Sequence, residues 1–380
     1  MKKCLTALVT TAFVGAAAAQ SSVTLFGVVD AGVARYSQGG VSKTMLDTSG
    51  NGPSSLGFRG TEDLGDGLSA NFWLEAALLN DVGAGFSSGN GNPSTNGGLA
   101  FGRRSTVSIA GKFGEIRLGR DTPPSWWNHV VFDPFFTAGP GSGANITSGG
   151  GVNGFAGANP LSFSRISNAL QYQWGFAPNA QSAIGQGVYL QLMHAFAENV
   201  RGTPARGQYS GGRVGYAEGP LNVAMSYARS KGPAYPADAA RGYSVFRSFN
   251  LGGSYNLGMA RLMAHLGMNN SDAAGTKHSH WGVAATINAG SGYIPITFNA
   301  VKQNNATSDG ASQIAAGYVY NLSKRTAIYA TASYIHNKNN GTYTFLGGNG
   351  GGQPGLQTAF GAGTSFGNGV GYGIGIRTSF

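Results

Sequence analysis

The sequence predicts an all-β protein, a single antiparallel β-barrel that crosses a membrane with about sixteen strands. Three observations favour this fold. The last residues alternate between apolar and small side chains, the first residues have the pattern of an export signal, and the composition is poor in charge yet not uniformly apolar. A barrel strand that faces lipid on one side and water on the other has this alternation, and aromatic residues anchor its rim.

The closing segment, residues 369–380, has two distinct faces. The apolar face carries Tyr372, Ile374, Ile376 and Phe380, and the opposite face carries Gly371, Gly373, Gly375 and Arg377. We therefore expect a lipid-facing last strand in which Phe380 is a membrane and assembly anchor. The alternative is an amphipathic edge strand of a soluble sandwich.

The amino terminus predicts export. Lys2 and Lys3 precede an apolar run at residues 5–16, and three alanines stand before Gln20. This pattern is typical of a cleaved signal peptide, and the run is too short to span a bilayer. Removal of residues 1–19 would leave one domain, residues 20–380. Cys4, the only cysteine, would be lost with the signal, so the mature chain would have no disulfide.

The composition agrees with a barrel that has a wet interior. Charged residues make up 11% of the chain and there are 64 glycines, whereas ordinary soluble domains carry about 25% charge. Without Lys2 and Lys3, the 25 basic residues become 23 against 15 acidic ones. The basic residues are scattered along the predicted strands, with no long basic run, so nucleic-acid binding is not expected. An interior that attracts anions fits better.

Alternation and turn residues predict the strands in chain order. They lie near residues 23–36, 54–63, 68–79, 99–110, a fifth that follows the turn at 112–114 and ends near 120, 165–174, 188–196, 208–217, 221–230, 244–256, 259–270, 278–289, 292–304, 312–321, 326–337 and 369–380. Short turns alternate with long polar loops, which is the usual pattern of an outer-membrane barrel.

Residues 121–163 show no strand periodicity. The first part of this segment is aromatic, with Trp126 and Trp127 among its bulky side chains, and the second part is rich in glycine. Loops of this length in compact domains are usually functional or disordered. We interpret the segment as an inserted loop that packs on another part of the protein; an ordinary surface loop is the alternative.

Several segments resemble the general-diffusion porins of Gram-negative bacteria, in particular those of the β-proteobacterial type found in Comamonas, Bordetella and Neisseria. The matching segments are SSVTLFGVVDAG (21–32), SSLGFRGTEDLGDGLSANFWLE (54–75), FGRRSTVSIAGKFGEIRLGRD (101–121) and the closing strand. The resemblance implies a homotrimer of sixteen-stranded barrels. It also implies that the third external loop, here residues 121–163, folds inward as a constriction loop, and that residues 80–98 contact a neighbouring subunit.

The resemblance further implies a basic wall opposite the constriction loop, formed here by Arg103, Arg104 and Arg165. Strand alternation independently predicts inward side chains at Arg59, Arg104, Arg117, Arg165 and Arg377. Alternation directs Arg103 outward, so either a bulge intervenes or Arg104 alone lines the pore. Ser55 stands where anion-selective members would carry another arginine.

The loop expected opposite this wall has little negative charge. Asp133 is the only acidic residue in 122–163, whereas a cation-preferring pore would line its loop with carboxylates. A net positive constriction that prefers anions is therefore predicted. Trp126 and Trp127 are expected to pack this loop against the wall or to line the opening.

No metal site, cofactor or catalytic set is expected. His265, His278 and His280 face inward by alternation, but no nearby carboxylate or cysteine completes a ligand set. The phosphate loop and paired catalytic carboxylates have no counterpart in the sequence.

These observations predict an outer-membrane channel for passive diffusion of small hydrophilic solutes and inorganic anions, surrounded by lipid and lipopolysaccharide. Three alternatives stay open: a substrate-specific channel for one anionic solute, a barrel enzyme that uses His129 or His194, and a soluble secreted adhesin.

Overall fold

The computed structural model describes residues 22–85, 98–147, 164–180, 182–198, 207–233, 240, 242–272, 277–345 and 367–380. Within these ranges the strands form an antiparallel sheet that closes into a barrel, because β1 pairs with β18 on one side and with β2 and β3 on the other. The predicted signal peptide lies outside the described residues.

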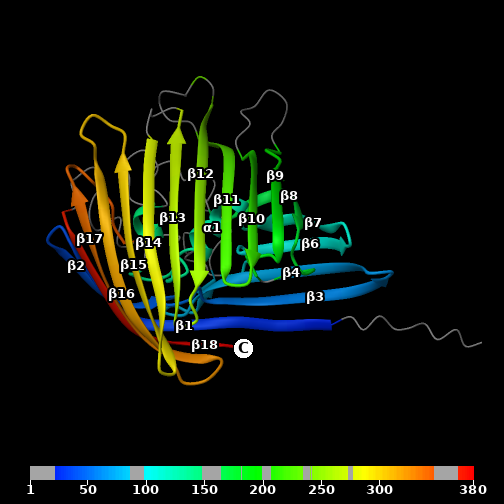
Figure 1. Ribbon diagram of the computed structural model, residues 1–380, viewed down its shortest axis with the longest axis horizontal. Coiled ribbons are helices and arrows are strands. Elements are labelled where there is room, and N and C mark those ends of the chain that lie inside the picture. Colours follow the sequence, from blue (N-terminus) through cyan, green and yellow to red (C-terminus); the bar gives the residue numbers. More distant parts are fainter. Residues whose placement is uncertain are drawn as a thin grey trace, which may run out of the picture.

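The curved sheet is visible in Figure 1. Its strands are β1 (Ser22–Gln38), β2 (Val41–Thr48), β3 (Ser55–Gly65), β4 (Leu68–Leu79), β5 (Ala84–Gly85), β6 (Arg104–Gly111), β7 (Gly114–Asp121), β8 (Ile166–Trp174), β9 (Gly187–Ala195), β10 (Tyr209–Glu218), β11 (Leu221–Pro233), β12 (Tyr243–Asn256), β13 (Ala260–Ser271), β14 (Lys277–Ala289), β15 (Gly292–Gln303), β16 (Gly310–Asn321), β17 (Thr326–Lys338) and β18 (Gly369–Ser379).

The eighteen strands labelled in the described residues occupy sixteen strand positions around the barrel. β2 and β3 both pair with β1. β2 pairs with the second half of β1 and β3 with the first half, so together they occupy one strand position. β5 has two residues and pairs only with the end of β4. The prediction of sixteen strands is therefore confirmed. β2 is not among the strands predicted from the sequence, because Ser42 and Thr44 give its outer face little apolar signal.

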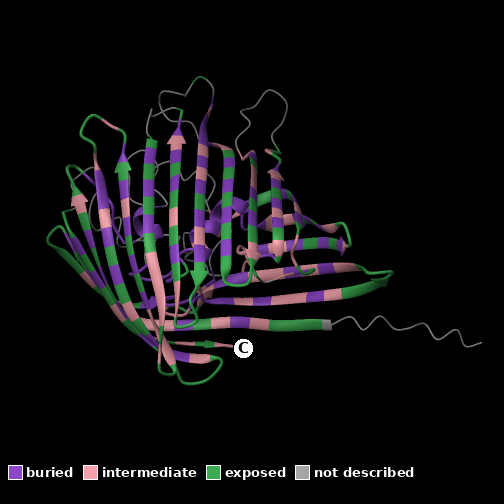
Figure 2. Cartoon of the chain, viewed as in Figure 1, coloured by how far each residue is buried: buried purple, intermediate pink, exposed green. Residues whose placement is uncertain are grey.

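The two faces of each strand differ as the alternation predicts. On neighbouring strands β6 and β7, Val107, Ile109, Ile116 and Leu118 are exposed on the outer face, while Ser108 and Arg117 are buried inside. Figure 2 shows this alternation as stripes of burial along the strands. Because apolar side chains face outward, this surface suits lipid rather than water.

The last strand closes the wall. Tyr372, Ile374 and Ile376 are exposed on the outer face of β18 at 50%, 65% and 50%, as the sequence predicts. Phe380 exchanges backbone hydrogen bonds with Gly27 of β1, at 3.1 and 3.2 Å. Closure leaves neither β1 nor β18 with an open edge, which an apolar environment requires. That Phe380 is also an anchor for assembly stays a prediction.

Short connections join alternate pairs of strands, as predicted. Residues 66–67 link β3 to β4, and residues 219–220 link β10 to β11. Asp66 and Gly67 both have positive φ, 51° and 79°, a conformation that tight hairpin turns require.

Two short helices, α1 (Pro124–Val131) and α2 (Ala144–Thr147), lie between β7 and β8 in the chain. Figure 1 shows α1 within the curve of the sheet, beside β10 to β12. Neither described helix is long and apolar enough to cross a membrane.

Candidate functional site

Five of the predicted arginines lie near one another along β3 to β8. We call Arg59, Arg103, Arg104, Arg117 and Arg165 the basic patch. Arg59 is on β3, Arg104 opens β6, Arg117 is on β7, and Arg103 and Arg165 immediately precede β6 and β8. Strand pairing places Arg59 opposite Trp73 of β4, and Arg104 opposite Glu75 of the same strand.

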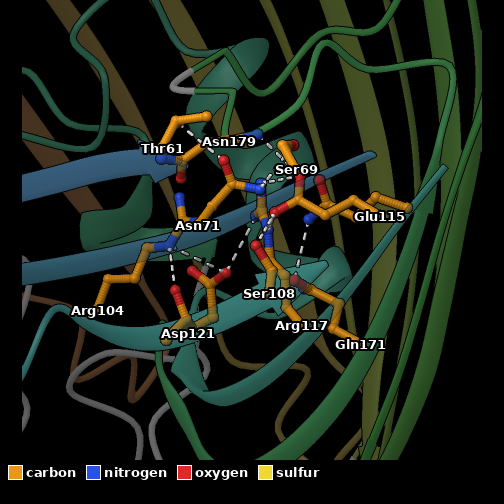
Figure 3. Close-up of polar contacts among 12 residues, drawn as sticks. Thr61, Ser69, Asn71, Arg104, Ser108, Glu115, Arg117, Asp121, Gln171 and Asn179 are labelled. Carbon is orange, nitrogen blue, oxygen red and sulfur yellow. Dashed lines mark hydrogen bonds and ion pairs between the residues drawn. The ribbon is translucent and has the colours of Figure 1, made fainter. Parts of the chain in front are cut away.

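Ion pairs neutralise most of this patch. Arg103 Nε lies 2.5 Å from Glu75 Oε1. Arg117 contacts Glu115 Oε1 at 2.7 Å and Asp121 Oδ2 at 3.3 Å. Arg104 Nε lies 3.6 Å from the same Asp121 oxygen, and Figure 3 shows Arg104 and Arg117 beside Asp121 and Glu115.

The charges can be balanced residue by residue. Arg104 and Arg117 together match Glu115 and Asp121, and Arg103 matches Glu75. The five arginines of the patch therefore face three carboxylates. The patch therefore carries two more positive than negative charges, and Arg59 contributes to this excess.

Arg103 does not follow the strand alternation. Strand alternation directs its side chain outward, yet Arg103 pairs with Glu75, whose side chain also accepts a hydrogen bond from the inner-face Trp73 at 3.0 Å. The physical reason is that β6 begins only at Arg104, so Arg103 lies before the strand and its side chain does not follow the strand alternation. Arg103 and Arg104 thus both contribute to the inner wall.

Neutral polar groups hold the patch rigid. Glu115 also accepts hydrogen bonds from Ser108 Oγ at 2.7 Å and from the backbone N–H of Asn179 at 3.0 Å. Beside it, Thr61 donates to Asn71 at 2.8 Å. Figure 3 shows these side chains converging from β3, β4, β6 and β7. Because the carboxylates and their neighbours share these bonds, the ion pairs are fixed parts of the wall.

Arg377 lies on the inner face of β18, as predicted, but away from the basic patch. Its register partner is Asp30 of β1. The Asp30 carboxylate accepts hydrogen bonds from Tyr329 Oη at 2.6 Å and from the backbone N–H groups of Asn51 and Gly52 at 2.9 and 2.7 Å. Arg377 therefore lies beside a carboxylate that helps to hold the segment between β2 and β3.

The segment 122–147 packs against the opposite part of the inner wall. α1 begins at Pro124, directly after Pro123, and proline suits the first turn of a helix. The helix contacts β9 to β12. Farther along, Gln313 of β16 donates to Pro140 O at 3.0 Å, and Asn269 of β13 donates to Thr147 O at 3.4 Å. Residues 148–163, the rest of the predicted constriction loop, lie outside the described residues.

The predicted loop residues differ in position. Trp126 is buried and lies 5.5 Å from His129, centroid to centroid, whereas Trp127 is partly exposed. The Asp133 carboxylate accepts the backbone N–H groups of Phe135, Thr137 and Gly143 at 3.0, 3.2 and 3.0 Å. Burial raises the pKa of Asp133 to about 6, and these three hydrogen bonds oppose the rise. Asp133 therefore organises its own segment.

Sequence reasoning missed the residues that anchor α1. Arg213 of β10 is buried and donates through Nε to Asn128 Oδ1 at 2.6 Å. Asn128 Nδ2 donates in turn to Asn250 Oδ1 at 2.7 Å and to Ala224 O at 3.1 Å. Alternation alone could have placed Arg213 inside, because its neighbour Val214 is apolar and exposed.

Four histidines lie inside the barrel. His265, His278 and His280 face inward as predicted, and His129 of α1 joins them, with ring centroids 5.4 Å apart for His129 and His280. Burial and the proximity of His265 lower the pKa of His129 to about 3, so its imidazole is neutral near pH 7. Among the described residues, no group of histidines, cysteines and carboxylates is arranged to hold a metal ion.

Known proteins share this chain's sequence pattern as well as its closed sheet. The family profile of Gram-negative porins matches residues 5–340. The chain belongs to this family. It is 38% identical over 356 residues to outer membrane porin protein 32 of Delftia acidovorans, with 90% of this chain and 92% of that protein covered. It is 31% identical over 392 residues to an outer membrane porin protein of Bordetella pertussis, with 89% and 95% covered.

The solved structures include a similar barrel. An anion-selective porin from Comamonas acidovorans superposes with a TM-score of 0.75 at 33% identity, over 95% of this chain and all (100%) of that chain. Membership in the family confirms the sixteen-stranded fold, the outer-membrane location and the expectation that the protein is not an enzyme. The barrel enzyme and the soluble adhesin are thereby excluded.

Proposed function

We propose that this porin forms a water-filled channel through which small hydrophilic solutes and ions diffuse passively, with a preference for anions. The observation that carries the proposal is the charge balance of the inner wall. The basic patch keeps two arginines in excess of its carboxylates, and the segment 122–163 contributes only Asp133.

The arrangement of the two walls supports a constriction between them. The basic patch lies on β3 to β7 and the residues that precede β6 and β8, while α1 packs on β9 to β12. A solute that crosses the barrel would pass between the arginines and residues 121–163, which we propose as the constriction loop. A low-dielectric wall of one sign raises the local concentration of the opposite ion. Similarity to the anion-selective porin from Comamonas acidovorans supports the same preference.

We also propose that three copies assemble in the outer membrane, in contact with lipid and lipopolysaccharide. The support for this is the resemblance to trimeric general-diffusion porins together with the apolar outer face of the barrel. The mass of the detergent-extracted protein tests the assembly.

The decisive experiment is the reversal potential of the purified porin in a planar bilayer, under a gradient of potassium chloride. A current carried mainly by chloride supports the proposed function. A current carried mainly by potassium would refute the anion preference and the role given to the basic patch.

A further inference from the structure

We infer that Arg59 is the residue of the basic patch whose charge sets the anion preference. This inference rests on the proposed function and makes it specific to one side chain. Three features of Arg59 carry it: aromatic rings hold its guanidinium, no carboxylate neutralises it, and it remains open to the lumen.

Two aromatic rings position the guanidinium. Arg59 Cζ lies 5.2 Å from the ring centroid of Trp73 and 5.6 Å from that of Phe26. The two rings pack edge to face with centroids 4.9 Å apart. Trp73 is itself fixed by its hydrogen bond to Glu75 at 3.0 Å. Such contacts hold a cation by its face and leave its N–H edges available.

The aromatic contacts do not cancel the charge. Among the described residues, Arg59 has no Asp or Glu oxygen within ion-pair distance, in contrast to Arg103, Arg104 and Arg117. Outside the described residues the sequence contains a single carboxylate, Asp238, between β11 and β12. Arg59 is also partly exposed, whereas Arg104 and Arg117 are buried.

An exposed guanidinium without a counter-ion attracts any small anion, and its N–H fork suits oxyanions such as carboxylates. The paired arginines act differently, because a permeating ion meets both members of each pair and their fields largely cancel. A unit charge therefore changes the occupancy of the lumen more at Arg59 than at a neutralised pair.

The test compares Arg59→Gln with a control that removes a complete ion pair. Mutation of one partner alone would unmask the other, so the control is the double variant Arg247→Gln with Asp272→Asn, an ion pair outside the basic patch whose removal leaves the net charge unchanged. Arg59→Lys keeps the charge and tests whether charge is what matters. Reversal potentials are measured in gradients of potassium chloride and of potassium acetate.

Arg59→Gln is expected to lower the anion-to-cation permeability ratio about fivefold near 0.1 M salt, because a unit charge roughly 5 Å from an ion acts on anions and cations in opposite directions and is only partly screened. Arg59→Lys and the paired control should stay within about twofold of the wild type by the same argument.

The outcomes separate this inference from the proposed function. A cation-selective wild type would overturn the proposed function. An anion-selective wild type whose ratio is unchanged in Arg59→Gln would overturn only the role of Arg59, as would an equal loss in the paired control. Heat-dependent migration in detergent gels verifies that each variant is folded. If Arg59→Gln does not fold, Arg59→Met supplies the neutral side chain and is judged by the same ratio.

Discussion

The anchoring of α1 yields a prediction that can be worked from the structure. Arg213 is 1% exposed, and its guanidinium donates to Asn128 Oδ1 at 2.6 Å, to Ala183 O at 2.5 Å and to Tyr189 Oη at 3.2 Å. The substitution Arg213→Met removes these donors and keeps an apolar stem of similar length. Asn128 retains its hydrogen bonds to Ala224 and Asn250, so the docking of α1 on the barrel wall is weakened but not abolished.

The expected magnitude follows from the one bond that joins Arg213 directly to α1. A hydrogen bond to a charged group contributes about 1.5–3 kcal/mol, and Asn128 Oδ1 would be left without its donor. Taking about 2–3 kcal/mol for the docking of α1, the detached population should rise roughly 30- to 160-fold, since 1.4 kcal/mol corresponds to a factor of ten. The barrel wall should be little affected, because its backbone ladder remains intact.

Single-channel recording in a planar bilayer measures this effect. Arg213→Met should show larger fluctuations of the open-channel current, as α1 moves into and out of the lumen. The matched control is Arg229→Met, because Arg229 is exposed on the outer face of β11. If the open-channel current of Arg213→Met fluctuates no more than that of Arg229→Met and the wild type, Arg213 does not anchor α1 and the reasoning is refuted.

Two further predictions concern charge and pH. The double variant Arg104→Glu with Arg165→Glu should shift selectivity toward cations, because it adds four negative units to the basic patch; an unchanged reversal potential would contradict this. The pKa of His129, about 3, lies below the ordinary histidine value of 6.5. The neutral His129 ring therefore contributes fully to the docking of α1 above about pH 6.5, and this contribution is lost as the pH falls toward 3. Current fluctuations should therefore grow on acidification in the wild type more than in His129→Gln, and identical pH profiles would exclude this role.

Local patterns account for what could be predicted from the sequence. Alternation places Leu118 outward and Arg117 inward without knowledge of any partner, because successive side chains of a strand point to opposite faces. The short turn at Asp66 and Gly67 is equally local. Alternation does not describe Arg103, because β6 begins only at Arg104. It also does not reveal β2, because the outer face of this strand is too polar to be recognised.

The sequence by itself determined the number of barrel strands, the lipid and water faces of each strand, and the presence of an irregular aromatic segment after β7. Only the tertiary structure decided which arginines are neutralised, because Glu75, Glu115 and Asp121 come close to them through strand pairing. It also brought Arg213 to Asn128, 85 residues away in the chain, and left Arg59 between two rings without a counter-charge. The faces of a strand follow from its own period, whereas the charge of a pore depends on which strands become neighbours when the sheet closes.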